Sequence, residues 1–169
     1  MILLKKIILL LLFIILPLTA CFQPYVTTSD DPNRNPEKAL KNLNDEFGLN
    51  IEGEEKYYLG QYDFGDGCNY YAYSITEECK NELLTLLNFE NNIGLEEMFF
   101  IRVDFLLEQT GIKTLESNLP DMTKNIVATA VLEGNQCQEV STQDEVRGHN
   151  AIILLLDTEC NMLYITWWY

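Results

Sequence analysis

The stretch Lys56–Ile75, KYYLGQYDFGDGCNYYAYSI, decides the fold because it predicts a β-hairpin. Two tyrosine-rich runs flank Gly65-Asp66-Gly67, a sequence typical of a tight turn between paired strands. Side chains alternate between the two faces of a strand, so Tyr71 and Tyr73 share one face and Tyr70 lies on the other. Some of these tyrosines are therefore expected to point outward.

Helices are predicted on both sides of this hairpin. Asn35 is a suitable N-cap and Pro36 suits a first turn, so a helix with one apolar stripe is expected to run to Gly48. After the hairpin, Ser74 and Glu77 have the spacing of a capping box. A second helix is expected from there to about Phe89.

The sequence of the C-terminal half predicts mainly strands. Residues 99–107 alternate apolar and polar side chains, which predicts a long strand, and 126–132 is rich in β-branched residues. A turn at Gly134-Asn135 with a short strand through Cys137 should follow, and 150–157 with 161–169 should form a terminal hairpin. The predicted fold class is α+β, an antiparallel sheet covered on one face by two helices.

The N-terminus has the features of a secretory signal. Lys5 and Lys6 precede an apolar run from Ile7 to Leu16, which is shorter than the roughly 20 residues that a spanning helix needs. The following residues, Leu18-Thr19-Ala20-Cys21, resemble the lipobox of bacterial lipoprotein precursors at every position. The resemblance implies that Cys21 receives a diacylglycerol and becomes the first mature residue.

The same resemblance implies a location. An Asp after the lipidated cysteine favours the inner membrane in that family, and this chain has Phe22 instead. The expected location is therefore the outer membrane, with the domain facing the periplasm. The expected organisation is a signal peptide over 1–20, a lipidated flexible tether over 21–35 and one globular domain over 36–169.

The other cysteines predict two disulfides. Cys68, Cys79, Cys137 and Cys160 are an even number in a chain expected in an oxidising compartment. Of the three possible pairings, Cys68–Cys79 and Cys137–Cys160 are favoured because each joins close neighbours in sequence. No C-x-x-C motif occurs and His149 is the single histidine, so neither a metal site nor a cofactor is predicted.

Charge limits the class of partner. The chain has a formal net charge of -15, and removing the leader leaves nine basic and twenty-six acidic residues, or about -17. Nucleic acid is an unfavourable partner because its binding depends on lysine and arginine contacts to phosphates. The membrane should be reached through the lipid anchor, and a protein partner, if charge guides it, should be basic.

Aromatic side chains are the candidate binding residues. Tyrosine and tryptophan give broad contacts at interfaces, although the same residues can simply be cross-strand pairs in a sheet. The candidates are Tyr57, Tyr58, Tyr62, Tyr71, Tyr73, Trp167 and Trp168. His149 has no accompanying nucleophile motif, so no catalytic residue is predicted.

The expected function is a noncatalytic protein-binding module of the envelope, of the inhibitor or immunity type. One alternative is a hydrolase that acts on the cell wall with two carboxylates. Another is a structural lipoprotein that docks on a larger envelope assembly. These alternatives stay open at the level of sequence.

Lipidation can be tested directly. Radiolabelled palmitate should enter the wild-type chain expressed in a bacterial host, because the Cys21 sulfur is the expected acceptor, and should not enter Cys21→Ser. Cys68→Ser is the matched control and should keep the label. Equal labelling of wild type and Cys21→Ser would falsify the lipobox interpretation.

Overall fold

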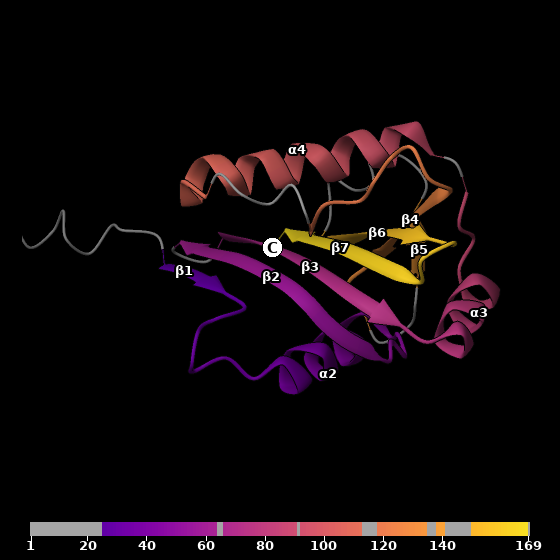
Figure 1. The fold of residues 1–169 in the computed structure, drawn as a ribbon, viewed down its shortest axis with the longest axis horizontal. Helices are drawn as coiled ribbons and strands as arrows, with labels where there is room; N and C mark the ends of the chain where they lie inside the picture. The colour runs from indigo at the N-terminus through magenta and orange to yellow at the C-terminus, as the bar shows by residue number, and fades with distance from the viewer. Residues whose placement is uncertain are drawn as a thin grey trace, which may run out of the picture.

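The structure is a computed structural model that describes residues 25–63, 66–90, 92–112, 118–134, 138–140 and 150–168. In this part of the chain, seven strands form one antiparallel sheet with helices on both faces (Figure 1). The strands are β1 (Tyr25–Thr28), β2 (Gly53–Asp63), β3 (Asp66–Ile75), β4 (Ile126–Leu132), β5 (Gln138–Val140), β6 (Ala151–Asp157) and β7 (Met162–Trp168). The helices are α2 (Pro36–Phe47), α3 (Glu77–Leu86) and α4 (Ile93–Thr110). Across the sheet the strand order is β1-β2-β3-β7-β6-β4-β5.

The two predicted hairpins are confirmed. β2 pairs with β3 from Gly53↔Ile75 to Asp63↔Asp66, and β6 pairs with β7 from Ala151↔Trp168 to Asp157↔Met162. A bulge between Glu55 and Tyr57 inserts one extra residue into β2. Bulges of this kind shift the alternation of a strand, which here leaves Glu55 and Tyr58 on the same face.

The sheet has a hydrophobic core on each face. α4 packs on one face, where the core contains Tyr70, Phe99 and Ile153. α2 and α3 cover the other face, whose core contains Phe47, Tyr71 and other side chains. The expectation that some hairpin tyrosines point to solvent is therefore wrong for Tyr70 and Tyr71, which are at most 4% exposed.

The segment 99–107 is helical, which corrects the predicted strand. Asn92 caps α4 by accepting a hydrogen bond from the backbone N–H of Leu95, and Gly111 ends it with a left-handed φ of 67°. The buried residues of α4 follow helical spacing, whereas Ile101 is 52% exposed. The alternation was misleading because a segment rich in apolar residues fits both the two-residue period of a strand and the 3.6-residue period of a helix. A helix forms here because the apolar face of the sheet must be covered by another layer.

The helical layers are therefore only partly as predicted. Two helices do share one face, but α4 covers the opposite face (Figure 1). The cap of α3 is Thr76 rather than Ser74, with the Thr76 hydroxyl accepting from the Cys79 backbone N–H at 3.1 Å. Within the described ranges, the search for a helix of membrane-crossing length and apolarity found none.

Part of the predicted tether belongs to the domain. Residues Tyr25–Thr28 form β1, an edge strand paired with β2 from Tyr25↔Tyr62 to Thr28↔Leu59. Pairing with β2 satisfies the backbone groups on one side of these four residues, which a polar composition does not reveal. Residues 21–24 lie outside the described residues.

The predicted Cys68–Cys79 disulfide is absent, and the described residues contain no disulfide. Cys68 and Cys79 are buried free thiols on opposite faces of the sheet, with Cys68 donating to the backbone oxygen of Arg102 on the α4 side at 3.8 Å. Burial raises the pKa of Cys68 to about 12. Cys160 is a free and exposed thiol, and Cys137, its predicted partner, lies outside the described residues.

A pair of substitutions tests the helical assignment of 99–107. Phe99→Ala should lower the free energy of unfolding by about 3–5 kcal/mol because it leaves a cavity between α4 and the sheet. Ile101→Ala should change it by less than about 0.5 kcal/mol, since that side chain faces solvent. In a strand both side chains would share the core face, so comparable losses in urea denaturation would contradict the helix.

Candidate functional site

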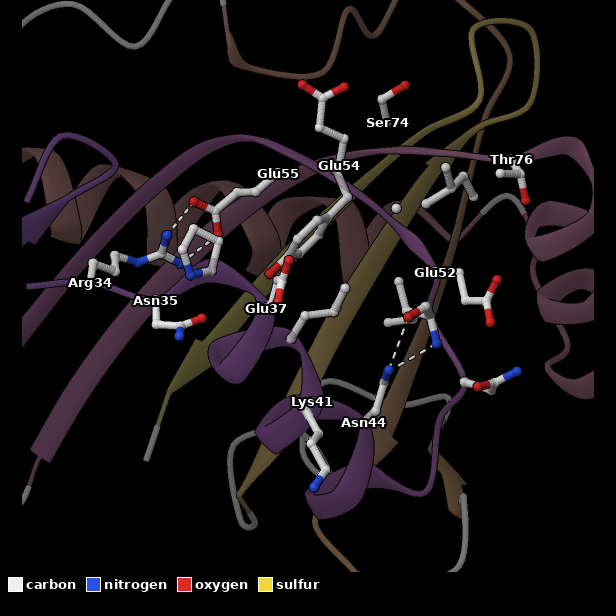
Figure 2. A pocket seen from close by; sticks show the side chains of 17 residues that line it. Arg34, Asn35, Glu37, Lys41, Asn44, Glu52, Glu54, Glu55, Ser74 and Thr76 are labelled. Carbon is white, nitrogen blue, oxygen red and sulfur yellow. Dashed lines mark hydrogen bonds and ion pairs between the residues drawn. The ribbon is translucent and has the colours of Figure 1, made fainter. Parts of the chain in front are cut away.

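An open groove of about 1180 Å³ lies between α2 and the adjoining ends of β2 and β3 (Figure 2). Residues 34–55 supply α2 and the incoming end of β2, and residues 73–76 supply the outgoing end of β3. Because β2 and β3 are antiparallel, the start of β2 and the end of β3 lie side by side, at the end of the hairpin farthest from the β2–β3 connection. The groove is thus assembled from segments that the hairpin register brings together.

Local hydrogen bonds hold the wall of the groove in place. The Asn44 side chain donates to the backbone oxygen of Ile51 and accepts from its backbone N–H, each at 2.9 Å. The Glu52 backbone N–H donates to the Cys79 sulfur at 3.3 Å. Gly48, with φ of 66°, lets the chain leave α2 and turn back toward these contacts.

The floor of the groove is apolar and its rim is acidic. Leu40 is partly buried, while Ile51 and Ile75 are nearly fully buried. Exposed carboxylates stand on the rim, from α2 and from the residue before β2 (Figure 2). We call Glu37 and Glu52 the rim carboxylates. Glu54 also lines the groove, but it lies on the opposite face of the sheet and its carboxylate points away from α2. With Glu55, four acidic residues line the groove against the two basic residues Arg34 and Lys41.

A buried ion pair closes one end of the groove. The Arg34 guanidinium donates to both carboxylate oxygens of Glu55, and the two side chains are 7% and 6% exposed. The guanidinium carbon also lies 3.8 Å from the ring centre of Tyr58, a cation–π geometry. Burial lowers the pKa of Arg34, but the hydrogen bond to Glu55 and its charge outweigh burial, so the pKa is raised overall.

Next to Arg34, a smaller pocket of about 380 Å³ is lined in part by three of the candidate tyrosines, Tyr58, Tyr62 and Tyr71. The Tyr58 hydroxyl donates to Asn69 Oδ1 at 2.8 Å and lies 2.9 Å from the Tyr62 hydroxyl. Since a hydroxyl has one hydrogen, Tyr62 is the donor in the second contact. Burial, followed by the neighbouring Tyr71, raises the pKa of Tyr58. Gly60 is required here, because a Cβ at this position would lie 2.0 Å from the Tyr58 hydroxyl oxygen.

The candidate aromatic residues do not form one surface. Tyr58, Tyr62, Tyr71, Tyr73 and Trp167 lie on the α2 face of the sheet, whereas Tyr57 and Trp168 lie on the α4 face. Tyr58, Tyr71 and Tyr73 are less than 5% exposed and belong to the core. Tyr62 and Trp168, at 39% and 38%, are the exposed members of the set.

Sequence reasoning missed the rim carboxylates. Glu52 falls within the acidic stretch IEGEE at 51–55, and Glu37 is in the first turn of a predicted helix, so local acidity was the available signal. The turn at Gly48 and the Asn44–Ile51 hydrogen bonds bring that stretch beside α2. His149 lies outside the described residues. A search of the described residues for three or more His, Cys, Asp or Glu side chains placed to hold a metal found no such group.

Comparison with known proteins gave no match: neither a family model, nor a curated protein, nor a solved structure resembles this chain significantly.

The Arg34–Glu55 pair should be a major source of stability. Arg34→Met should lower the free energy of unfolding by about 3–5 kcal/mol because it leaves a buried carboxylate without its cation. The double variant Arg34→Met/Glu55→Leu should recover much of that loss, since no charge stays buried. Denaturant unfolding at neutral pH measures both.

The matched control is the exposed pair between Lys56 and Glu54. Lys56→Met should cost less than about 1 kcal/mol, as surface ion pairs do. An Arg34→Met loss no larger than the Lys56→Met loss would contradict the role assigned to the buried pair.

Proposed function

We propose that this chain is a lipid-anchored envelope protein whose domain binds a basic segment of another protein in the groove, without catalysis. The anchor is a diacylglycerol on Cys21, and the expected location is the outer membrane, facing the periplasm. The lipobox resemblance supports the anchor. The groove, with an apolar floor and an acidic rim, is the observation that carries the binding proposal.

Charge complementarity defines the partner. Glu37 and Glu52 have no ion-pair partner among the described residues, so their carboxylates are available to lysine or arginine side chains. Each exposed pair formed in this way contributes only about 0.2–1 kcal/mol. The rim therefore selects and steers a basic segment, and the association rate should fall as salt screens it.

The floor supplies the larger part of the affinity. Burying apolar surface contributes roughly 25 cal/mol per Å², so one aliphatic or aromatic side chain placed over Leu40 and Ile75 outweighs a rim contact. The segment that fits best is thus amphipathic, with apolar side chains toward the floor and basic side chains toward the rim. Asn44 and Cys79 hold the wall rigid, which limits the entropy lost on binding.

A cell-wall hydrolase is the second candidate, because two exposed carboxylates, Glu37 and Glu52, line one groove. Glu55 is engaged by Arg34, so the rim carboxylates would have to supply the acid and the base. Incubation of the purified chain with peptidoglycan tests this: fragment release that disappears in Glu37→Gln or Glu52→Gln would favour the enzyme. A structural lipoprotein, the remaining alternative, differs from the first proposal in docking on a larger envelope complex through its aromatic side chains.

Site-specific photo-crosslinking in intact cells tests the binding proposal. A photoreactive residue in place of Lys41, on the groove, should give one discrete protein adduct. The same residue in place of Glu97, exposed on α4, is the control and should give none. The adduct should disappear in Glu37→Lys/Glu52→Lys, because charge reversal repels a basic partner.

The identity of the captured protein completes the test. Mass spectrometry should place the crosslink in a segment rich in lysine or arginine next to apolar residues. Equal adducts from both positions, a captured segment that is acidic, or an adduct that survives charge reversal would each contradict binding through the groove.

A further inference from the structure

The position expected for the anchor lies close to the sheet. Cys21 and Tyr25, the first residue of β1, are four residues apart in sequence. Even fully extended, four residues span at most about 14 Å. An anchored chain therefore holds the start of β1 next to the bilayer, and the domain cannot stand off on a long tether.

The strand register shows which other residues share that end of the sheet. Tyr25 pairs with Tyr62, and Val26 lies in one row across the sheet with Gln61, Cys68 and Trp168. Three strand spacings separate Val26 from Trp168, or about 14 Å. The start of β1, the end of β2, the start of β3 and the C-terminal end of β7 thus lie together, toward the left in Figure 1.

This end of the sheet carries exposed apolar side chains. Val26, Tyr62 and Trp168 are 36%, 39% and 38% exposed, and we call them the anchor-end residues. Within the described ranges, Tyr62 and Trp168 are the aromatic members of the exposed large hydrophobic set. Trp168 is held in place by stacking on Phe105 of α4, with ring centres 4.9 Å apart. Tyrosine and tryptophan favour the membrane–water interface, where an apolar ring and a polar tip are both satisfied.

We propose that the anchor-end residues rest in the interface of the bilayer that holds the lipid, and that the groove is presented away from it. The proposal depends on lipidation of Cys21, which is part of the proposed function. Tyr62 and Gly53 are nine residues apart in β2, or about 30 Å at strand spacing. The groove, at the Gly53 end, is therefore lifted clear of the headgroups and accessible to a protein partner.

Charge defines the lipid surface. β2 ends at Asp63 and β3 begins at Asp66, and the chain as a whole is strongly acidic. Anionic headgroups would repel it, so the contact fits a zwitterionic surface. Anionic lipid should weaken the contact even where the anchor still holds the protein.

The two tryptophans of the chain, Trp167 and Trp168, are natural probes of this orientation. The mature lipidated protein is placed in phosphatidylcholine vesicles whose acyl chains are brominated near the headgroup, and its emission is compared with that in unbrominated vesicles. The tryptophan emission of wild type and of Trp167→Phe should be quenched by the brominated lipid, whereas the emission of Trp168→Phe should lose most of this quenching. Trp167 is the matched control because it faces Phe47 on the α2 side, with ring centres 5.3 Å apart.

A third variant reports on the opposite end. In Trp167→Phe/Trp168→Phe, the further change Glu52→Trp places the single tryptophan on the groove rim, where it should not be quenched. Unfolding transitions show that each variant is folded. Quenching of Trp168 but not of a tryptophan at position 52 supports the orientation. Loss of the Trp168 quenching when phosphatidylglycerol is added to the vesicles supports the preference for a zwitterionic surface.

Vesicle flotation separates the two proposals. Protein that floats with vesicles but shows no quenching of Trp168, or equal quenching at position 52, overturns the orientation and leaves the anchor and the groove intact. Protein that does not float lacks the anchor, which overturns the orientation together with that part of the proposed function.

Discussion

Burial of both faces of the central strands is the constraint on which the rest of the structure depends. Tyr70 and Tyr71 are adjacent in sequence but lie in different cores, and all seven residues of β6 are buried. Strands without a solvent face need a helical layer on each side of the sheet. α2 and α3 form one layer and α4 forms the other. The position of each helix is thus determined by an apolar face of the sheet that would otherwise be exposed to solvent.

Burial on both faces also determines where polar groups are tolerated. The Asn69 side chain, 1% exposed within the sheet, accepts a hydrogen bond from the Tyr58 hydroxyl, and the absence of a Cβ at Gly60 leaves room for that contact. Arg102, 2% exposed beneath α4, donates to the backbone oxygens of Ala151 and Thr166 at 2.8 and 3.3 Å. Burial lowers the pKa of Arg102 to about 10. These bonds join α4 to β6 and β7, and they offset part of the cost of burying a cation.

The same architecture gives the molecule two distinct ends. β2 and β3 are long, antiparallel and covered by α2, so the groove lies at one end of the hairpin and the turn at the other. The short strand β1 meets β2 only near the turn, which brings the N-terminal segment to that end. A binding site and a membrane attachment on opposite ends of one hairpin do not compete for the same surface.

Local sequence determined the features that depend on neighbouring residues. Asn35, Pro36 and Gly48 bound α2 as expected. Strand-like runs on either side of a short turn, Gly65-Asp66-Gly67 in one case and Asp157–Cys160 in the other, identified both hairpins, because caps and turns are interactions over a few residues. The tertiary structure alone decided that 99–107 is a helix, since an apolar-rich segment takes the shape that the uncovered face requires. It also separated Cys68 from Cys79, because neighbours in sequence can lie on opposite faces of a sheet. The groove was decided in the same way, by a register that brings residues 73–75 of β3 beside 53–55 of β2, and no local pattern of charge or periodicity contains that distance.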